Sequence, residues 1–322
     1  MSFRIVIGLA VALVLWQTAT AQTYPERPIR WIMPYSVGGA SDGVARMMAP
    51  EMGKLLNGQV IVENRVGAGG TIGTDAAAKA APDGHTWVWG GSAALAVNVT
   101  LQKNLPYDPL SDFAPVCRIG VAPYVLVVHP ALGVTSLKDL VGLAKARGSD
   151  MTYASPGNGT GSHLAMELLK SRAGISLRHV LYKGTAPAVT DVLANHVPLL
   201  FEAVGPLAPH VRSGKLIALA TTAGKRLPAL PDVPTMKELG FDDFQIEAWT
   251  GLLVPAKTPP AIVARLDDAC RQVLSPRDFQ EAVSRQHGLE PDYAGREEFR
   301  DFMRSEISKW AKLLALSNAK LD

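Results

Sequence analysis

The chain repeats one pattern of hydrophobic and polar positions: a short apolar run, a glycine-rich loop, and then apolar residues at helical spacing. The first instance has an apolar run at 29–33, a loop at 34–42 and apolar side chains three or four apart from Val44 to Leu56. A buried strand and an amphipathic helix produce these two periodicities. Pro50 falls inside the helix, where it predicts a kink or a split.

The pattern recurs and predicts an α/β fold. Further predicted strands cover 59–63, 85–89, 151–155, 198–201, 216–222 and 249–255, and further helices cover 71–81, 136–147, 163–172, 186–194, 207–213, 261–274, 277–286 and 297–316. We interpret apolar stretches near 118–124 and 220–225 as two crossings between lobes, because a chain of this length exceeds one typical core. The predicted lobes are 22–120 plus 224–322, and 121–223.

Two glycine loops indicate an anion site. Glycine permits positive φ and close approach of the backbone, and a helix start offers unpaired N–H groups and a favourable dipole. Neither 35–42 nor 155–162 contains Lys or Arg. We therefore expect backbone N–H groups, helix starts and water to hold a carboxylate. Gly39→Val is predicted to abolish binding, and Lys183→Ala, just outside the second loop, to weaken it modestly.

Other classes of site fit the sequence less well. Gly157, Gly159 and Gly161 resemble a dinucleotide fingerprint, but the third glycine would have to stand at 162, and no acidic residue follows at the distance that ribose binding requires. His163 and Glu167 stand four apart on one helix face, yet two ligands do not make a metal site. We expect no metal and no cofactor.

The amino-terminal sequence indicates export, and the net charge argues against one class of ligand. Residues 1–21 have one charge, Arg4, an apolar run and a small-residue end at Ala21, which is typical of a cleaved secretory signal peptide. The net charge of +3 becomes +2 when Arg4 is removed, which argues against nucleic-acid binding. We expect an exported, periplasmic and monomeric protein.

The two cysteines, Cys117 and Cys270, lie in a strand-like and a helical stretch far apart in sequence. They could pair in an oxidising compartment. We expect two unpaired, mostly buried thiols, because a free buried Cys behaves as a small hydrophobic residue.

Several ordered motifs cover nearly the whole mature chain, and with them it resembles the Bug family, the substrate-binding proteins of tripartite tricarboxylate transporters. The motifs are Gly38-Gly39-x-x-Asp42-x-x-Ala45-Arg46, Val62-Glu63-Asn64-Arg65-x-Gly67-Ala68-Gly69-Gly70, Pro82-Asp83-Gly84, Gly157-x-Gly159-x-x-Ser162-His163-Leu164, His179-Val180-x-Tyr182-Lys183-Gly184, Leu230-Pro231-Asp232-Val233-Pro234-Thr235 and Trp249-x-Gly251. The resemblance implies a type II periplasmic-binding-protein fold, with two α/β lobes and a ligand cleft between them.

The resemblance also implies a ligand-binding set, carried over by matching position. Its members are Tyr35, Ser36, Val37, Gly38, Gly39, Ala40, Ser92, Ala93, Ser155, Gly159, Thr160 and Glu202. The chain departs from the family pattern at several positions. Val37 stands where Pro is usual, His85 where Tyr is usual and Leu181 where Pro is frequent, and the pattern has an Asp near the position of Glu202.

The function we expect is capture of a small carboxylate, such as a di- or tricarboxylate, and its delivery to membrane permease subunits. Two alternatives stay open at this point. One is a ligand-loaded sensor partner of a receptor kinase, which would use the same cleft. The other is a secreted serine hydrolase with Ser155 or Ser162, His163 and Asp191, although no Gly-x-Ser-x-Gly elbow is present.

Overall fold

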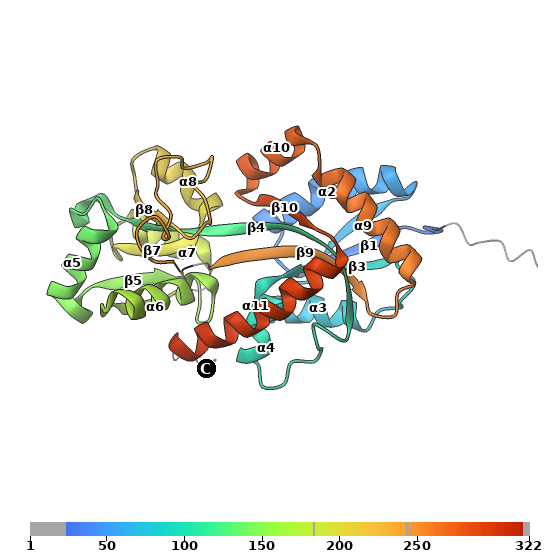
Figure 1. Cartoon of the computed structure of the whole chain (residues 1–322), viewed down its shortest axis with the longest axis horizontal. Coiled ribbons are helices and arrows are strands. Elements are labelled where there is room, and N and C mark those ends of the chain that lie inside the picture. The colour runs from blue at the N-terminus through green and yellow to red at the C-terminus, as the bar shows by residue number, and fades with distance from the viewer. Residues whose placement is uncertain (1–23, 183, 243, 245, 318–322) are drawn as a thin grey trace, which may run out of the picture.

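The computed structural model describes residues 24–182, 184–242, 244 and 246–317, and Figure 1 shows their arrangement. The predicted signal peptide at 1–21 lies outside the described residues, as does Lys183. Two groups of helices and strands lie at opposite ends of an elongated molecule, and two long strands, β4 (Phe113–Val128) and β9 (Glu247–Pro255), run between them (Figure 1). None of the described helices combines the length and apolar character needed to cross a membrane.

The described strands form one curled sheet in the order β2-β1-β3-β9-β4-β7-β5-β6, with β8 and β10 also paired to β4. Their bounds are β1 Ile29–Met33, β2 Val60–Asn64, β3 Thr86–Gly91, β4 Phe113–Val128, β5 Thr152–Ser155, β6 Arg178–Leu181, β7 Leu199–Ala203, β8 Ile217–Thr221, β9 Glu247–Pro255 and β10 Glu290–Ala294. The neighbours β2, β1 and β3 are parallel, as are β6, β5 and β7. Each lobe therefore has its own parallel strands.

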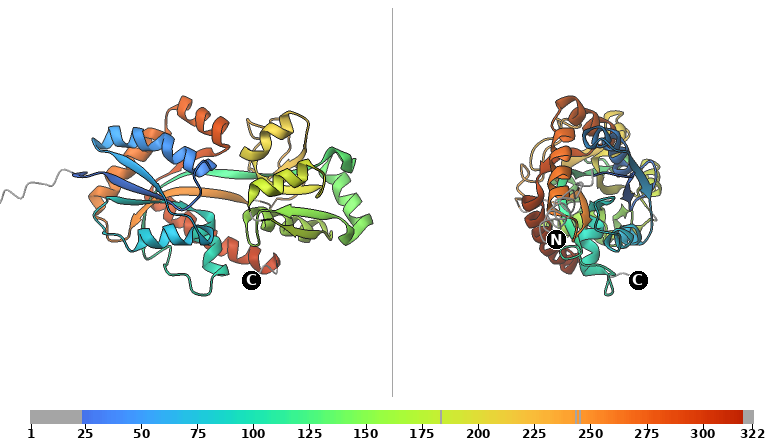
Figure 2. Two further views of the ribbon diagram at one scale, coloured as in Figure 1. Left: turned by 180° about the vertical axis from the view of Figure 1, so that it is seen from behind. Right: turned by 90° about the vertical axis from the view of Figure 1, so that its right-hand side faces the viewer.

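Helices cover both faces of the first-lobe strands, with α2 and α9 on one side and α3 on the other (Figure 2). The helices are α2 Ala40–Leu56, α3 Thr71–Ala78, α4 Asn98–Leu101, α5 Leu137–Arg147, α6 Gly161–Ala173, α7 Thr185–Leu193, α8 Val204–Arg212, α9 Pro260–Leu274, α10 Arg277–His287 and α11 Arg296–Ser317, with a π-helical turn at Ala93–Val97 and 3-10 turns at Ala68–Gly70, Pro130–Leu132 and Gly148–Asp150. Parallel strands need such crossover helices, which bury both faces of the sheet.

Strand β4 connects the lobes by changing its partners. Its residues up to Pro123 pair with β9, and those from Tyr124 onward pair with β7. The change falls at the predicted first crossing. The predicted return at 220–225 is wrong, because β8 pairs with the second half of β4 and Met236 and Ile246 still hydrogen-bond to the end of β8 and the residue after it. We therefore place the return at β9, where the first lobe resumes, and not at 224.

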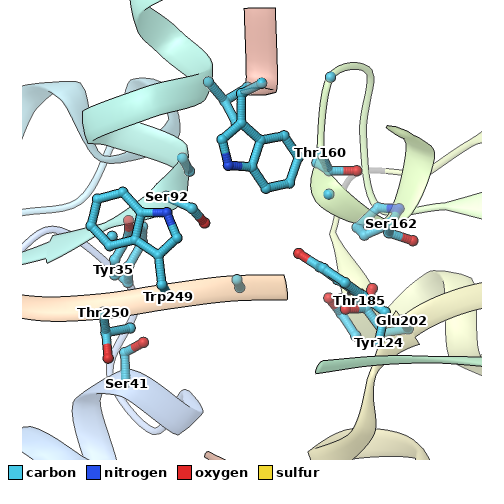
Figure 3. Close-up of a pocket in the computed structure, with 18 residues that line it drawn as sticks. Tyr35, Ser41, Ser92, Tyr124, Thr160, Ser162, Thr185, Glu202, Trp249 and Thr250 are labelled. Carbon is cyan, nitrogen blue, oxygen red and sulfur yellow. Dashed lines mark hydrogen bonds between the residues drawn. The ribbon is translucent and has the colours of Figure 1, made fainter. Parts of the chain in front are cut away.

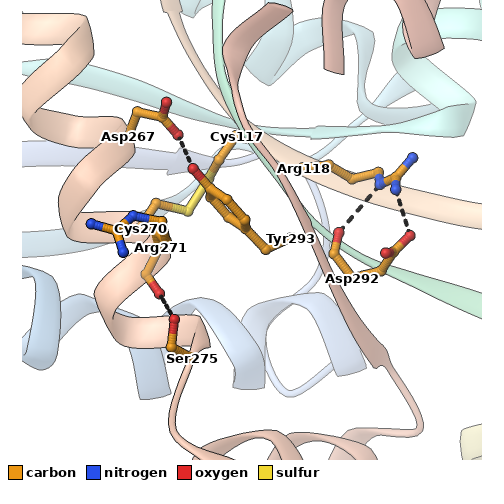
Figure 4. Close-up of a disulfide and its surroundings, with 8 residues drawn as sticks. All are labelled: Cys117, Arg118, Asp267, Cys270, Arg271, Ser275, Asp292 and Tyr293. Atoms are coloured by element: carbon orange, nitrogen blue, oxygen red, sulfur yellow. Dashed lines mark hydrogen bonds and ion pairs between the residues drawn. A yellow bond between two sulfur atoms is a disulfide. The ribbon is translucent and has the colours of Figure 1, made fainter. Parts of the chain in front are cut away.

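The disulfide between Cys117 and Cys270 corrects a second expectation (Figure 4). The two residues, 153 positions apart in sequence, have Cα atoms 6.8 Å apart because α9 packs against β4. Both are buried in the first-lobe core, which also contains Trp31 and Trp89. Periodicity could place each cysteine in its own element, but only the packing of helix on strand brings them together.

Pro50 neither splits nor ends α2, which runs unbroken from Ala40 to Leu56. The proline is exposed, so the carbonyl that loses its helical donor faces the solvent side of the helix. Opposite it, Val44, Met48 and Met52 are fully buried in the first-lobe core. This packing holds the helix together across the missing hydrogen bond.

Candidate functional site

A cavity of about 390 Å³ lies where the two lobes meet, beside β4 and β9. Figure 3 shows that Tyr35, Ser92 and Trp249 face it from the first lobe and Thr160, Thr185 and Glu202 from the second. Its lining residues are Tyr35, Ser41, Gly91, Ser92, Ala93, Val97, Tyr124, Pro156, Gly159, Thr160, Gly161, Ser162, Thr185, Glu202, Ala248, Trp249, Thr250 and Trp310. Glu202 is the one charged residue among these described lining residues.

Several helices begin at this cavity. Gly161 and Thr185, the first residues of α6 and α7, line it, and so do Ser41 in the first turn of α2 and Ala93 at the start of the π-helical turn. The first N–H groups of a helix have no partner within the helix and carry a partial positive charge. The cavity therefore offers neutral donors to an anion from both lobes.

The first glycine loop is held by the buried carboxylate of Asp42. Its Oδ2 accepts hydrogen bonds from the Gly38 N–H and from Arg46 Nε, both at 2.9 Å, and its Oδ1 accepts one from Asn64 Nδ2 at 2.8 Å. Asn64 Nδ2 also donates to the Tyr35 carbonyl at 2.9 Å. Burial raises the pKa of Asp42, but these donors outweigh it and hold the pKa below its usual value. The carboxylate thus joins the loop to α2 and β2.

Glu202 places a buried acid in the second-lobe wall. Its Oε1 accepts from the Ala203 N–H at 2.8 Å and its Oε2 from Thr185 Oγ1 at 3.3 Å. Burial raises its pKa to about 7, with those two hydrogen bonds opposing the shift. Burial also raises the pKa of neighbouring Tyr124, and the Glu202 charge acts in the same direction. Near neutral pH, this acid is therefore divided between its charged and protonated forms.

Two tryptophans line the cavity and share one acceptor. Trp249 on β9 and Trp310 on α11 both donate their Nε1–H to Glu306 Oε2, at 3.0 and 2.9 Å. Glu306 is 4 % exposed, and Lys309 Nζ lies 2.5 Å from its other oxygen. The carboxylate therefore fixes the orientation of both indoles and ties α11 to β9.

The structure brings some of the expected residues to the cavity and leaves others away from it. Those that line it are Tyr35, Ser92, Ala93, Gly159, Thr160 and Glu202. Ser36, Val37, Gly38, Gly39 and Ala40 form an exposed loop next to it, with Val37 72 % exposed. Ser155 is buried, and its Oγ bonds to the Gly157 carbonyl at 3.2 Å. A ligand role for all twelve residues stays a prediction.

The two glycines of the first loop also differ from each other. Gly38 has φ of 79°, whereas Gly39 has φ of −71°, which any residue adopts. A Cβ added to Gly39 would lie 3.3 Å from the Ser36 carbonyl oxygen. The positive φ belongs to Gly38, so valine at Gly39 would meet no strain from a left-handed backbone, contrary to expectation. The predicted loss of binding in Gly39→Val stays a prediction.

Sequence reasoning missed much of the cavity wall. Trp249 is part of the Trp249-x-Gly251 family motif, so its place in this motif could have indicated a role in the cavity wall. No sequence pattern singles out Trp310, because it occupies one of several apolar positions of an amphipathic helix. Tyr124 reaches the cavity only because β4 changes partners there, and Gly161 because its lack of a Cβ leaves room for the Tyr124 hydroxyl.

The groups named for a serine hydrolase do not assemble into a triad. Ser162 Oγ donates to the Phe201 carbonyl, and His163 Nδ1 accepts from the Gly159 N–H. Asp191 instead bonds to Tyr182 and His196. Within the described residues, no cluster of His, Cys, Asp and Glu has the arrangement of a metal site.

Comparison with known proteins gives this cavity a context. The family described as "Tripartite tricarboxylate transporter family receptor" matches residues 44–318. Protein BugT of Bordetella pertussis is 38% identical over 98% of this chain and 97% of its own length. The R. palustris structure "Rpa4515 with adipate" has 30% identity and a TM-score of 0.83 over 92% of this chain and 100% of its own.

A second solved relative is "MatC (Rpa3494) from Rhodopseudomonas palustris with bound malate", with 31% identity and a TM-score of 0.76 over 90% of this chain and 100% of its own. Together with a solved structure titled "Structure of periplasmic binding protein BugD", these relatives confirm the predicted periplasmic-binding-protein fold with two α/β lobes. The chain belongs to the tripartite tricarboxylate transporter receptor family, which includes the Bug proteins.

Proposed function

We propose that this protein captures a small carboxylate in the periplasm and delivers it to the membrane permease of a tripartite tricarboxylate-type transporter. The observation that carries the proposal is the cavity between the lobes, where helix starts from both sides meet and where none of the lining residues that the structure describes is Lys or Arg. Neutral donors hold a carboxylate by charge-assisted hydrogen bonds. Relatives whose structures hold adipate and malate support the same ligand class.

Capture requires the lobes to close on the ligand. The chain crosses between them in β4 and β9, so rotation about these two strands changes the cavity. The closed form gains ligand contacts from both walls, which is the free energy that drives closure. Export fits this role: the predicted cleavage after Ala21 would leave Gln22 as the amino terminus, which mass spectrometry of periplasmic material tests.

A thermal-shift screen against mono-, di- and tricarboxylates and amino acids, with malate and adipate included, tests the proposal. A ligand at about 100 times its Kd stabilises the folded state by about 2.7 kcal/mol, which gives a clear rise in Tm. Small-angle scattering with the best compound should show a smaller radius of gyration. Absence of any shift across the carboxylates would contradict the proposal.

The variant Gly161→Ala tests whether the compounds found in the screen bind in this cavity. The added Cβ would lie 2.1 Å from the Tyr124 hydroxyl oxygen, at the start of α6, so the wall must move. We expect carboxylate binding to weaken at least tenfold, which corresponds to about 1.4 kcal/mol. Gly142→Ala in α5 is the matched control, since its Cβ would meet nothing within 4 Å. Equal binding by both variants would place the ligand elsewhere.

Glu202 adds a pH dependence to the same site. A second ligand carboxylate next to Glu202 requires this acid to take up a proton, so dicarboxylate binding should strengthen as pH falls through about 7, the raised pKa of Glu202. Glu202→Gln is neutral at every pH. It should therefore bind a dicarboxylate more tightly than the wild type at pH 8. Its affinity should not change as the pH falls through about 7, and calorimetric titration measures both affinities.

A further inference from the structure

Three stacked rings lie behind the second glycine loop. Tyr153 on β5 stacks on His179 on β6 with ring centroids 4.9 Å apart, and His179 stacks on His163 on α6 at 4.4 Å. The planes are within 14° of parallel. Tyr153 is fully buried and His163 is 5 % exposed. None of the three lines the cavity.

Each histidine holds one glycine of the loop at 156–160. The Gly159 N–H donates to His163 Nδ1 at 3.1 Å. A backbone amide can only donate, so Nδ1 is unprotonated and the ring carries its proton on Nε2. The Gly157 N–H donates to Ser155 Oγ at 3.3 Å, and that oxygen lies 2.6 Å from His179 Nε2. The second ring therefore acts on the loop through one serine.

The same loop forms part of the cavity wall through Pro156, Gly159 and Thr160. Gly159 has φ of 70°, and a Cβ there would lie 2.4 Å from Leu101 Cδ1 at the end of α4. The loop is thus held between the first lobe and the ring stack. A change in its anchor moves a wall that a ligand would contact.

We propose that His163 and His179 are positioning residues that hold this loop in its ligand-binding shape, and that protonation of His163 releases the loop by removing the acceptor of the Gly159 amide. The effect on ligand affinity rests on the proposed function. The hold on the loop itself does not, because it exists without ligand.

Burial keeps both rings neutral at ordinary pH. Burial lowers the pKa of His163 to about 4, with His179 and Lys170 acting in the same direction and Glu167 opposing them. Burial likewise lowers the pKa of His179, again against Glu167. Lys170 Nζ lies 2.7 Å from Glu167 Oε1, so these two charges largely offset each other. His163 also stands in the first turn of α6, where a cation is unfavourable.

Hydrogen exchange of the ligand-free protein tests the hold directly. The readout is the protection factor of the Gly159 amide, which removes the intrinsic pH dependence of exchange. His163→Phe keeps a ring in the stack but has no acceptor. His163→Asn places an amide oxygen near the position of Nδ1 and does not titrate. His196→Asn, at an exposed histidine of the same lobe, is the control. Circular dichroism and Tm confirm that each variant folds.

We expect His163→Phe to lower the protection of Gly159 about tenfold at pH 7, while His163→Asn and His196→Asn stay within about threefold of the wild type. Between pH 7 and 4, where about half of His163 is protonated, protection should fall about fivefold in the wild type and stay constant in His163→Asn. Unchanged protection in His163→Phe, or a flat wild-type profile, would overturn the proposal.

Measurements of ligand affinity test whether the hold on the loop also affects ligand binding. With malate and adipate as probes at pH 7.5, His163→Phe should bind about tenfold more weakly than His163→Asn. Equal binding by the two variants would remove the ligand-positioning role even if the exchange result holds. If neither dicarboxylate binds the wild type, the carboxylate function is in question, whereas the exchange experiment still decides whether the histidines hold the loop.

Discussion

The two glycine loops stand on opposite sides of the cavity and are anchored by opposite chemistry. A charged acceptor, Asp42, holds the first loop through the Gly38 amide. A neutral acceptor, His163, holds the second through the Gly159 amide. A carboxylate with a lowered pKa keeps its charge through the mildly acidic range, whereas an imidazole loses its acceptor when it is protonated. Similar loops can therefore respond differently to the same change of pH.

The glycines also serve different needs in the two loops. Gly38 has a positive φ, but a Cβ there would meet nothing within 4 Å. Gly159 combines a positive φ with close contact to Leu101 of the first lobe. The first glycine is needed for its own backbone conformation, and the second also for the approach of the two lobes.

The largest expected difference between the loops comes from a matched pair, Gly159→Val and Gly39→Val. Valine at Gly159 must adopt a left-handed φ and displace Leu101, so we expect a loss of about 2–4 kcal/mol in the free energy of unfolding. Gly39 has an ordinary φ and a single tight contact, so its loss should be about 1 kcal/mol or less. Urea unfolding measures both. Equal losses would mean that the loops are not constrained differently.

Asp42→Asn should have the next largest effect. The change replaces a buried acceptor of three hydrogen bonds and leaves the Arg46 charge without its partner. Because Arg46 is itself 46% exposed, water replaces part of what it loses, and we expect a loss of about 1–3 kcal/mol. Asp301→Asn, which removes an exposed ion pair with Arg304, is the control and should leave the unfolding free energy within error. An equally small loss of unfolding free energy in Asp42→Asn and Asp301→Asn would show that Asp42 does not anchor the first loop.

The smallest expected effect is a difference in pH dependence between the anchors. The pKa of His163 is lower in the folded protein than the ordinary value of 6.5, so its stabilising contribution is present above pH 6.5 and is lost as pH falls toward about 4. Relative to His163→Asn, the wild type should lose about 1 kcal/mol between pH 7 and 5.5. The Asp42 anchor should not change there, because its lowered pKa lies below that window.

Comparing wild type with His163→Asn at each pH is necessary because other groups titrate in this range. Burial raises the pKa of Glu202 and of Glu247 to about 7, which favours the folded state as pH falls and opposes the histidine effect. The contributions of these two acids to the free energy of unfolding are the same in the wild type and in His163→Asn, so they cancel when the two proteins are compared. Identical pH profiles for the two proteins would contradict the assignment of His163 as the acid-sensitive anchor.

Much of the fold could be predicted from the sequence because the signal is local. The apolar run at 29–33 and the helical spacing after Val44 each reflect burial of one face, and both elements are present. The helices predicted at 261–274 and 277–286 are confirmed as α9 and α10 within one residue at each end. The return crossing could not be predicted this way, because an apolar strand reads the same in either lobe.

The sequence by itself determined the order of strands, glycine loops and helices, and the lack of cations in both loops, because these depend on residue type and on spacing within a few turns of chain. Only the tertiary structure decided that Cys117 meets Cys270, that Trp310 reaches the cavity, and that His163 accepts the Gly159 amide in a stack with His179. The disulfide and the ring stack join separate elements, and Trp310 comes to the cavity from the last helix. The physical reason is that burial and hydrogen-bond partners are properties of packed surfaces, which periodicity along one element does not specify.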